Sequence, residues 1–231
     1  MDKLSDLFRW RKKVYLKDGK RTVGTAWIRL VGDADYQQAR NISLKRSKQL
    51  RNRLRDETTD DYVAAFTDID SMSKDELILG VIFSEISDYR DEALVTTQDE
   101  SLPELDGDNP SLEEQEEHQT KLEEIRRKRV EVLAAQIDKK SEERKEALNS
   151  ITDIEELKRL YRDAVVNIKC IELFTTTFRN FCAYKGTFKD DRYKELAFDS
   201  FDEFEESASQ LKSQLLAAYT NLEITGEDLK N

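Results

Sequence analysis

The chain has 231 residues, of which 38 are Lys or Arg and 49 are Asp or Glu, and its formal net charge is −11. Seven Gly and two Pro are too few for an all-β fold, whose turns recur about every eight to twelve residues, so this composition predicts long helices. The single His and two Cys argue against His-based catalysis and structural zinc sites. The sequence has no Gly-rich phosphate loop and no nucleophile elbow. We therefore expect no catalytic, cofactor or metal site, and a protein that is not an enzyme.

Charge is distributed unevenly along the chain. Residues 1–56 contain 16 Lys or Arg and 6 Asp or Glu, whereas residues 57–231 have a net charge of −21. A basic N-terminal part therefore precedes an acidic remainder. Such an asymmetry indicates which partners the protein can bind and how its own parts can dock on one another, and it does not indicate the fold.

The N-terminal part contains the one convincing strand signal. Two apolar runs, 14–16 and 23–30, flank Asp18-Gly19, which tolerates the positive φ angles of a type I′ turn and so predicts a β-hairpin. An isolated hairpin is marginal in water, so we expect this one to pack on a helix or to pair with the edge of another chain. Trp27 in the second strand is our candidate for contact between copies, which would make the protein a homo-oligomer.

A helix of about 22 residues is expected to begin at Asp33, and it carries a strong cluster of positive charge. Four of its arginines are candidate partner-binding residues: Arg46, Arg51, Arg53 and Arg55. We expect this face to meet an acidic partner helix or the acidic linker of this chain, or to be solvated. Nucleic acid is not the expected partner, because Tyr36 is the only aromatic residue close by and the acidic remainder would repel it.

The middle of the chain contains an acidic linker. Residues 57–72 are acidic and turn-like, and Ser73 with Glu76 forms a capping box that predicts the start of a helix. The apolar stripe expected on this helix comprises Leu77, Ile78, Val81, Ile82, Ile86 and Tyr89. Residues 98–117 contain nine acidic residues and both prolines, too little apolar surface to offset their ordering entropy. The expected domains are a basic head at 1–97, an acidic linker at 98–110 and a helical body at 111–231.

Three helices are predicted in the body. Each begins at a Ser or Thr that is followed by a Glu three positions later, and the expected ranges are 111–149, 152–186 and from 200 onward. Gly186 is expected to stop the second helix, which is the most apolar. Its stripe, expected to form the core of the body, includes Leu157, Tyr161, Ile168, Phe174 and Phe178.

The sequence shows no signal for export or membrane insertion. The first residues lack the apolar segment of a signal peptide, and an apolar run of seven residues at 77–83 is far short of the roughly 20 that a membrane span needs. We therefore expect a soluble protein with no membrane partner. Cys170 and Cys182 are expected to be free buried thiols, because a helical rise of about 1.5 Å per residue places them about 18 Å apart.

Short motifs at the two ends of the chain resemble one known family. In one-letter code they are VYLKDG at 14–19, AWIRL at 26–30, LRNRLRD at 50–56, FDSFDEF at 198–204, LLAAY at 215–219 and EDLKN at 227–231. Their order is similar to that in the tail assembly chaperones of long-tailed double-stranded DNA phages. Those proteins are small, acidic, mostly helical and encoded beside the tape measure protein. The match covers about the first 56 and the last 35 residues.

The resemblance implies a role and carries over no binding residue. It implies that the protein binds apolar helical stretches of the tape measure protein in the host cytoplasm and keeps them soluble while the tail tube assembles. Two alternatives stay open. One is a structural virion or adaptor protein that acts through its long helices. The other is a phage protein that binds a host factor or nucleic acid, for which binding should weaken steeply with salt.

Overall fold

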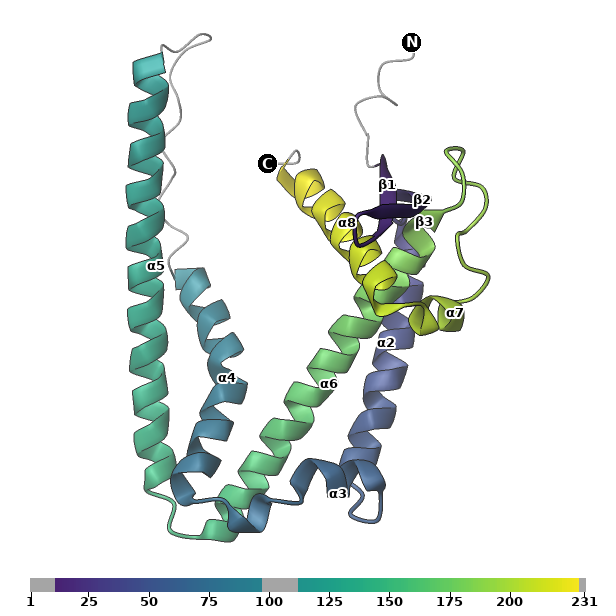
Figure 1. Cartoon of the computed structure of the whole chain (residues 1–231). Coiled ribbons are helices and arrows are strands. Elements are labelled where there is room, and N and C mark those ends of the chain that lie inside the picture. Colours follow the sequence, from purple (N-terminus) through teal and green to yellow (C-terminus); the bar gives the residue numbers. More distant parts are fainter. Residues whose placement is uncertain (1–10, 97–111, 229–231) are drawn as a thin grey trace. The chain divides into compact units, whose positions relative to one another are not determined.

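The computed structural model describes residues 11–96 and 112–228, and most of them are helical (Figure 1). The predicted mainly α fold with a small N-terminal β-hairpin is therefore confirmed. The elements in chain order are β1 (Arg11–Asp18), β2 (Arg21–Arg29), α2 (Asp33–Leu54), α3 (Asp60–Phe66), the 3₁₀ helix η1 (Ile69–Ser71), α4 (Lys74–Thr96), α5 (Leu112–Asn149), α6 (Ile154–Gly186), β3 (Thr187–Phe188), α7 (Phe201–Glu206) and α8 (Ser209–Asp228).

The chain divides into two compact units, which we describe separately. Unit 1 contains Met1–Asn52 together with Lys169–Asn231, and unit 2 contains Arg53–Ile168. This division differs from the head and body expected from the sequence, because the hairpin shares its core with the C-terminal helices. The expected linker at 98–110 lies outside the described residues and stays a prediction, as does the capping box at Ser111.

The sheet of unit 1 contains the predicted hairpin and one further short strand. β1 and β2 are antiparallel, with Asp18 opposite Arg21, so the turn residues are Gly19 and Lys20 rather than Asp18 and Gly19. Of these two residues, only Gly19 has a positive φ, of 56°, and this fits a type II′ turn. The predicted type I′ turn is wrong, because it would require a positive φ at Lys20 as well. β3 pairs with β2, which makes β2 the central strand.

The core of unit 1 joins the hairpin to the C-terminal helices. Ile28 is fully buried, and it belongs to one cluster with Phe181 of α6, Phe204 of α7 and Leu215 of α8. The prediction that the hairpin packs on a helix is therefore confirmed. Gln214 of α8 adds two hydrogen bonds to the backbone of β1: its amide oxygen accepts from the N–H of Lys17 at 2.8 Å, and its amide nitrogen donates to the carbonyl of Lys17 at 2.7 Å.

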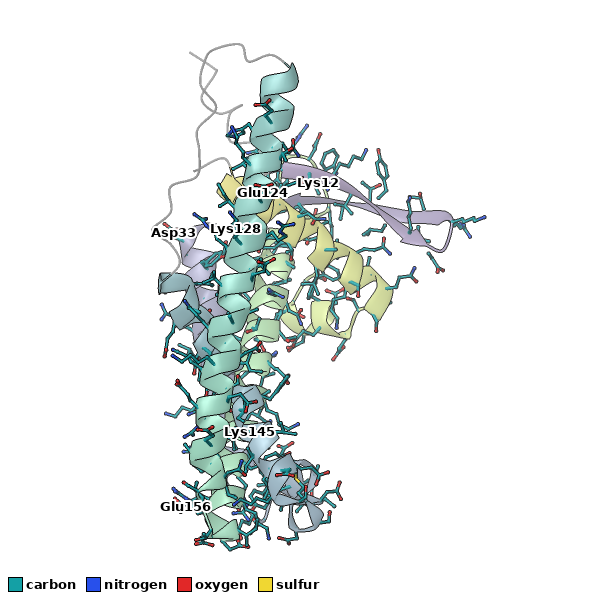
Figure 2. The ribbon with its side chains drawn as sticks, turned by 90° about the vertical axis from the view of Figure 1, so that its left-hand side faces the viewer. Lys12, Asp33, Glu124, Lys128, Lys145 and Glu156 are labelled. Carbon is teal, nitrogen blue, oxygen red and sulfur yellow. The ribbon has the colours of Figure 1, made fainter. Side chains whose placement is uncertain are left out.

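Unit 2 contains the pair of helices α4 and α5, which lie side by side (Figure 1). Glu85 of α4 accepts hydrogen bonds from the guanidinium of Arg144 on α5 at 2.9 Å, and Lys140 forms an ion pair with Glu92, about two turns further along α4. The order of these contacts makes the two helices antiparallel. Figure 2 shows the charged side chains that α5 carries along its length, with Glu124, Lys128 and Lys145 labelled on it.

The capping box predicted for α4 is confirmed. The N–H of Glu76 donates to the hydroxyl of Ser73 at 3.3 Å, and the N–H of Ser73 donates to the carboxylate of Glu76 at 2.7 Å. The backbone hydrogen bond from Ser73 and that from its hydroxyl together lower the pKa of Glu76. The residues before α4 are more regular than predicted, because 57–72 contains the helix α3 and the turn η1.

Two predicted helix boundaries are wrong. α6 is capped by Asp153 and not by Thr152, since the carboxylate of Asp153 accepts from the N–H of Glu155 at 3.0 Å. The last helix is two helices. Ser200 caps α7 as predicted, but Ser207 adopts an extended backbone and its hydroxyl donates to the carbonyl of Phe204 at 2.7 Å, which ends α7 before α8 begins.

The predicted stripe of α6 is buried only in part. Leu157 is buried, but Phe174 and Phe178 are only half-buried, because the core of unit 1 centres on the last turns of α6 instead. Gly186 ends α6 as predicted. Cys170 and Cys182 are buried and free, as predicted. In the described part of the chain, no helix combines the length and the apolar character that crossing a bilayer requires.

Candidate partner-binding surfaces

Arg46 is held within unit 1 by acidic and aromatic neighbours. Its guanidinium donates to both carboxylate oxygens of Glu205 at 2.8 Å, lies 3.8 Å from Asp202 and stands 5.0 Å from the ring centre of Phe201. All three neighbours belong to α7. The acidic partner helix expected for this arginine is thus supplied, at least in part, by the chain itself.

Two of the other three candidate arginines, Arg53 and Arg55, also lie near acidic residues of this chain. In unit 2, Arg53 forms an ion pair with Asp61 of α3 at 2.7 Å, and Arg55 lies 3.7 Å from Asp163 of α6. Arg51 is half-buried in unit 1. These contacts use carboxylates of α3 and α6. A role of Arg51, Arg53 and Arg55 in binding a partner stays a prediction.

Trp27 lies in the central strand, where neighbours flank it on both sides. Its cross-strand partners are Lys13 of β1 and Phe188 of β3, and its side chain is half-buried. Its backbone is therefore not at an edge of the sheet. Contact between copies through strand pairing would have to use the outer edge of β1, where Gln214 already bonds Lys17, or that of the two-residue β3, where Phe188 already forms a bridge with Leu196.

α4 carries an exposed apolar stripe, which the sequence pattern did not distinguish from the buried apolar residues of the same helix. Leu79 is 58% exposed, Phe83 is 69% exposed and Ile86 is 37% exposed. Their spacing of four and three residues places them on one face of the helix, which we call the α4 stripe. The stripe predicted on this helix is therefore divided, because Leu77, Ile78, Val81 and Ile82 are buried whereas Ile86 is exposed.

The opposite side of α4 is covered by other parts of unit 2. Leu77, Ile78 and Val81 are buried, and the backbone of Gly80 lies so close to the ring of Tyr161 on α6 that a Cβ atom would stand 2.3 Å from it. Tyr89 donates a short hydrogen bond to Glu85, and burial together with that bond raises the pKa of Tyr89. The α4 stripe therefore points away from the side that holds the helices of unit 2 together.

The sheet of unit 1 has an outer face that carries cations and aromatic rings. Cross-strand partners share a face, and Val14 with Ala26 lies on the core side, so the partners on either side of them face outward. These outward pairs are Arg11 with Arg29, Lys13 with Trp27, and Tyr15 with Thr25, and we call them the outer face. The two strands run side by side with side chains on both faces (Figure 2).

Cations stand over the rings of the outer face. The ammonium of Lys13 is 5.1 Å from the ring centres of both Tyr15 and Trp27, and the guanidinium of Arg29 is 4.7 Å from that of Phe188. These distances lie within the range of cation–π attraction. The sequence signal was present as the period-two alternation of RKKVYLK at 11–17, which places every second residue on one face.

The loop after β3 extends this arrangement. Tyr193 packs edge-on against Phe188 with ring centres 5.4 Å apart, and the guanidinium of Arg11 stands 4.9 Å from the Tyr193 ring centre. Burial raises the pKa of Tyr193, and Arg11 opposes that shift. Tyr193 is the one non-glycine residue of the described chain with a positive φ, 55°.

Burial raises the pKa of two ionisable groups of unit 1, Cys182 and Tyr219. Burial raises the pKa of the Cys182 thiol to about 12, so the thiol stays protonated and a poor nucleophile near neutral pH. Burial also raises the pKa of Tyr219, whose hydroxyl accepts from the N–H of Val31 at 3.4 Å. Across residues 11–96 and 112–228, no three His, Cys, Asp or Glu side chains cluster as metal ligands would.

No protein-family model, curated protein or solved structure matches this chain.

Proposed function

We propose that this chain is a non-enzymatic binding protein that holds an amphipathic helix of a protein client against the α4 stripe. The observation that supports this proposal is the exposure of Leu79, Phe83 and Ile86 on one face of a helix whose other side is packed. Anchors at helical spacing are the usual means by which two amphipathic helices bind one another. Exposed side chains of this size are unfavourable in water, and a client helix would remove them from it.

The resemblance to phage tail assembly chaperones suggests the client. A tape measure protein offers long apolar helical segments, and the host cytoplasm is where such segments would need a partner before the tail tube closes around them. A net charge of −11 would keep the complex dispersed, because like-charged complexes repel one another. In this proposal the protein is a chaperone that binds the client and takes no covalent part in assembly.

Co-expression tests the proposal directly. The client would be a tape measure segment that is insoluble when produced alone, and we expect the wild-type chain to bring it into the soluble fraction and to co-purify with it. The double variant Phe83→Asp with Leu79→Asp should lose this ability, because two carboxylates on the α4 stripe would have to be desolvated on binding. Circular dichroism of the purified variant checks that α4 still folds.

A matched control lies on the neighbouring helix. Val130 and Val132 of α5 are 63% and 48% exposed, so Val130→Asp with Val132→Asp adds the same charge to the same unit away from the α4 stripe. We expect this control to keep the client soluble. Equal loss in both double variants, or none in either, would contradict binding through the α4 stripe. Retention of the chain in finished particles would instead favour a structural virion protein.

A further inference from the structure

Positive charge is concentrated on the hairpin of an otherwise acidic protein. Residues 11–29 contain seven Lys or Arg and one acidic residue, Asp18, which gives this segment a net charge of +6. On the outer face, Arg11, Lys13 and Arg29 supply three of these cations and no strand residue supplies a carboxylate. A surface of this kind attracts polyanions locally even where the whole chain is negative, because salt screens charges more than about 8–10 Å away.

Aromatic rings lie among these cations. Tyr15 is 55% exposed, Trp27 is half-buried, and the ammonium of Lys13 stands 5.1 Å from both ring centres. Cations that alternate with accessible rings on a sheet surface suit the binding of single-stranded nucleic acids, because the phosphates pair with the cations and the unpaired bases stack on the rings. A free phosphate ion would make no use of the rings.

The backbone of Tyr193 gives independent support. A bulky side chain at a φ of 55° is strained, and such strain is concentrated at sites where a side chain must be held in a particular place. Here the strained residue holds its ring against Phe188 and next to Arg11, so that the arrangement of cation and ring continues from β1 across β3 into the loop.

We propose that the outer face binds single-stranded nucleic acid, with Tyr15 and Trp27 stacking on bases and Arg11, Lys13 and Arg29 contacting phosphates. Single strands rather than duplexes are the ligand, because the flat faces of bases are accessible only where they are unpaired. This activity belongs to unit 1 and is separate from the client site on α4 of unit 2.

The test is a fluorescence anisotropy titration of the full chain against a labelled oligothymidylate of about 20 nucleotides, longer than the roughly 4–16 nucleotides that one such surface covers. At about 50 mM salt we expect saturable binding that weakens with added salt. Tyr15→Ala should weaken binding about fivefold or more, since stacking on one ring contributes at least that much. An unlabelled duplex of the same length should compete poorly.

Two charge variants separate a local site from the effect of net charge. Arg11→Gln with Lys13→Gln removes two cations from the outer face, and the slope of log affinity against log salt should become shallower by about 1.4. Arg40→Gln with Lys48→Gln removes one arginine and one lysine from exposed positions on α2 in the same unit, and it should leave that slope unchanged.

Several results would overturn the proposal. One is the absence of binding with protein at about 100 μM, the weak end of non-specific affinities. Another is an equal change of slope in the two double variants, and a third is duplex binding as tight as single-strand binding. Binding to phosphatidylserine vesicles that depends on Tyr15, with no binding to the oligonucleotide, would assign the face to membranes instead. The Phe83→Asp, Leu79→Asp variant should bind the oligonucleotide normally, so failure of either proposal leaves the other testable.

Discussion

Gly186, the last residue of α6, has no room for a side chain. A Cβ atom there would stand 2.6 Å from the carbonyl oxygen of Arg29 and 2.7 Å from the ring of Tyr219. The backbone oxygen cannot rotate away, so we expect Gly186→Ala to lower the free energy of unfolding by about 1–3 kcal/mol, as overpacking typically does. Urea denaturation followed by circular dichroism measures this change.

Gly32 is the matched control for that substitution. An added Cβ at Gly32 meets nothing within 4 Å. Gly32→Ala should change the free energy of unfolding by less than about 1 kcal/mol, because the reduced freedom of the unfolded chain offsets the poorer N-cap that Ala makes where the Gly32 carbonyl accepts from Tyr36. Equal stability of the two variants would show that Arg29 and Tyr219 do not constrain position 186.

Asp70 and Lys158 form a surface ion pair in unit 2 whose effect on ionisation can be measured. The ammonium of Lys158 donates to the carboxylate of Asp70 at 2.7 Å, and this hydrogen bond with the charge of Lys158 lowers the pKa of Asp70 below its ordinary value of 3.8. A lowered folded-state pKa means that the pair stabilises the fold above pH 4 and loses this effect as the pH falls through the lowered value.

We expect Lys158→Met to raise the pKa of Asp70 toward its ordinary value, measured by NMR titration of the side-chain carboxyl carbon. Glu76 is the internal control in the same spectra. Its pKa is lowered by hydrogen bonds from Ser73 and not by Lys158, so it should keep its low value in the variant. If the Asp70 pKa does not move, then the two side chains are not in contact in solution.

At the scale of elements, local sequence signals predicted well where the helices lie. They predicted poorly which neighbouring element packs against each face of a helix. The capping boxes at Ser73 and Ser200 could be recognised because a cap is a contact within one turn. The cap of α6 was predicted one residue early. Thr152 and Asp153 are both favourable N-cap residues, and only the direction of the backbone at that turn determines which of them lies at the N-cap position.

Two further elements show why the rest could not be predicted. α4 is apolar on several sides, so its period cannot tell which face a neighbour covers, and the predicted stripe contains both buried residues and the exposed Ile86. β3 is two residues long, too short for any alternation, and it exists only because Thr187 and Phe188 meet Ile28 and Trp27 of β2. The exposure of the α4 stripe depends on such tertiary information, whereas the outer face had a local signal in the alternation at 11–17.

At the scale of the whole molecule, unit 1 is assembled from the two ends of the chain. The hairpin and α2 come first in the sequence, whereas the end of α6, β3, α7 and α8 come last, and residues of both groups form one core cluster. Sequence reasoning divided the chain at its acidic segment because a change in composition is a local signal. Residues almost 190 positions apart, such as Ile28 and Leu215, belong to one core cluster, and this leaves no such signal in the sequence.

Because residues from both ends of the chain form one core, we expect the two ends to lose structure together. Ile28 is fully buried, so Ile28→Ala should lower stability by about 2–5 kcal/mol, and native-state hydrogen exchange should show reduced protection in β1, β2 and α8 alike. Ile78→Ala makes a similar cavity in unit 2, where Ile78 is 2% exposed, and it should reduce protection in α4 and α5 more than in the hairpin. If Ile28→Ala freed the hairpin while α8 kept its full protection, the hairpin would be an independent module, and the outer face could then act apart from the C-terminal helices.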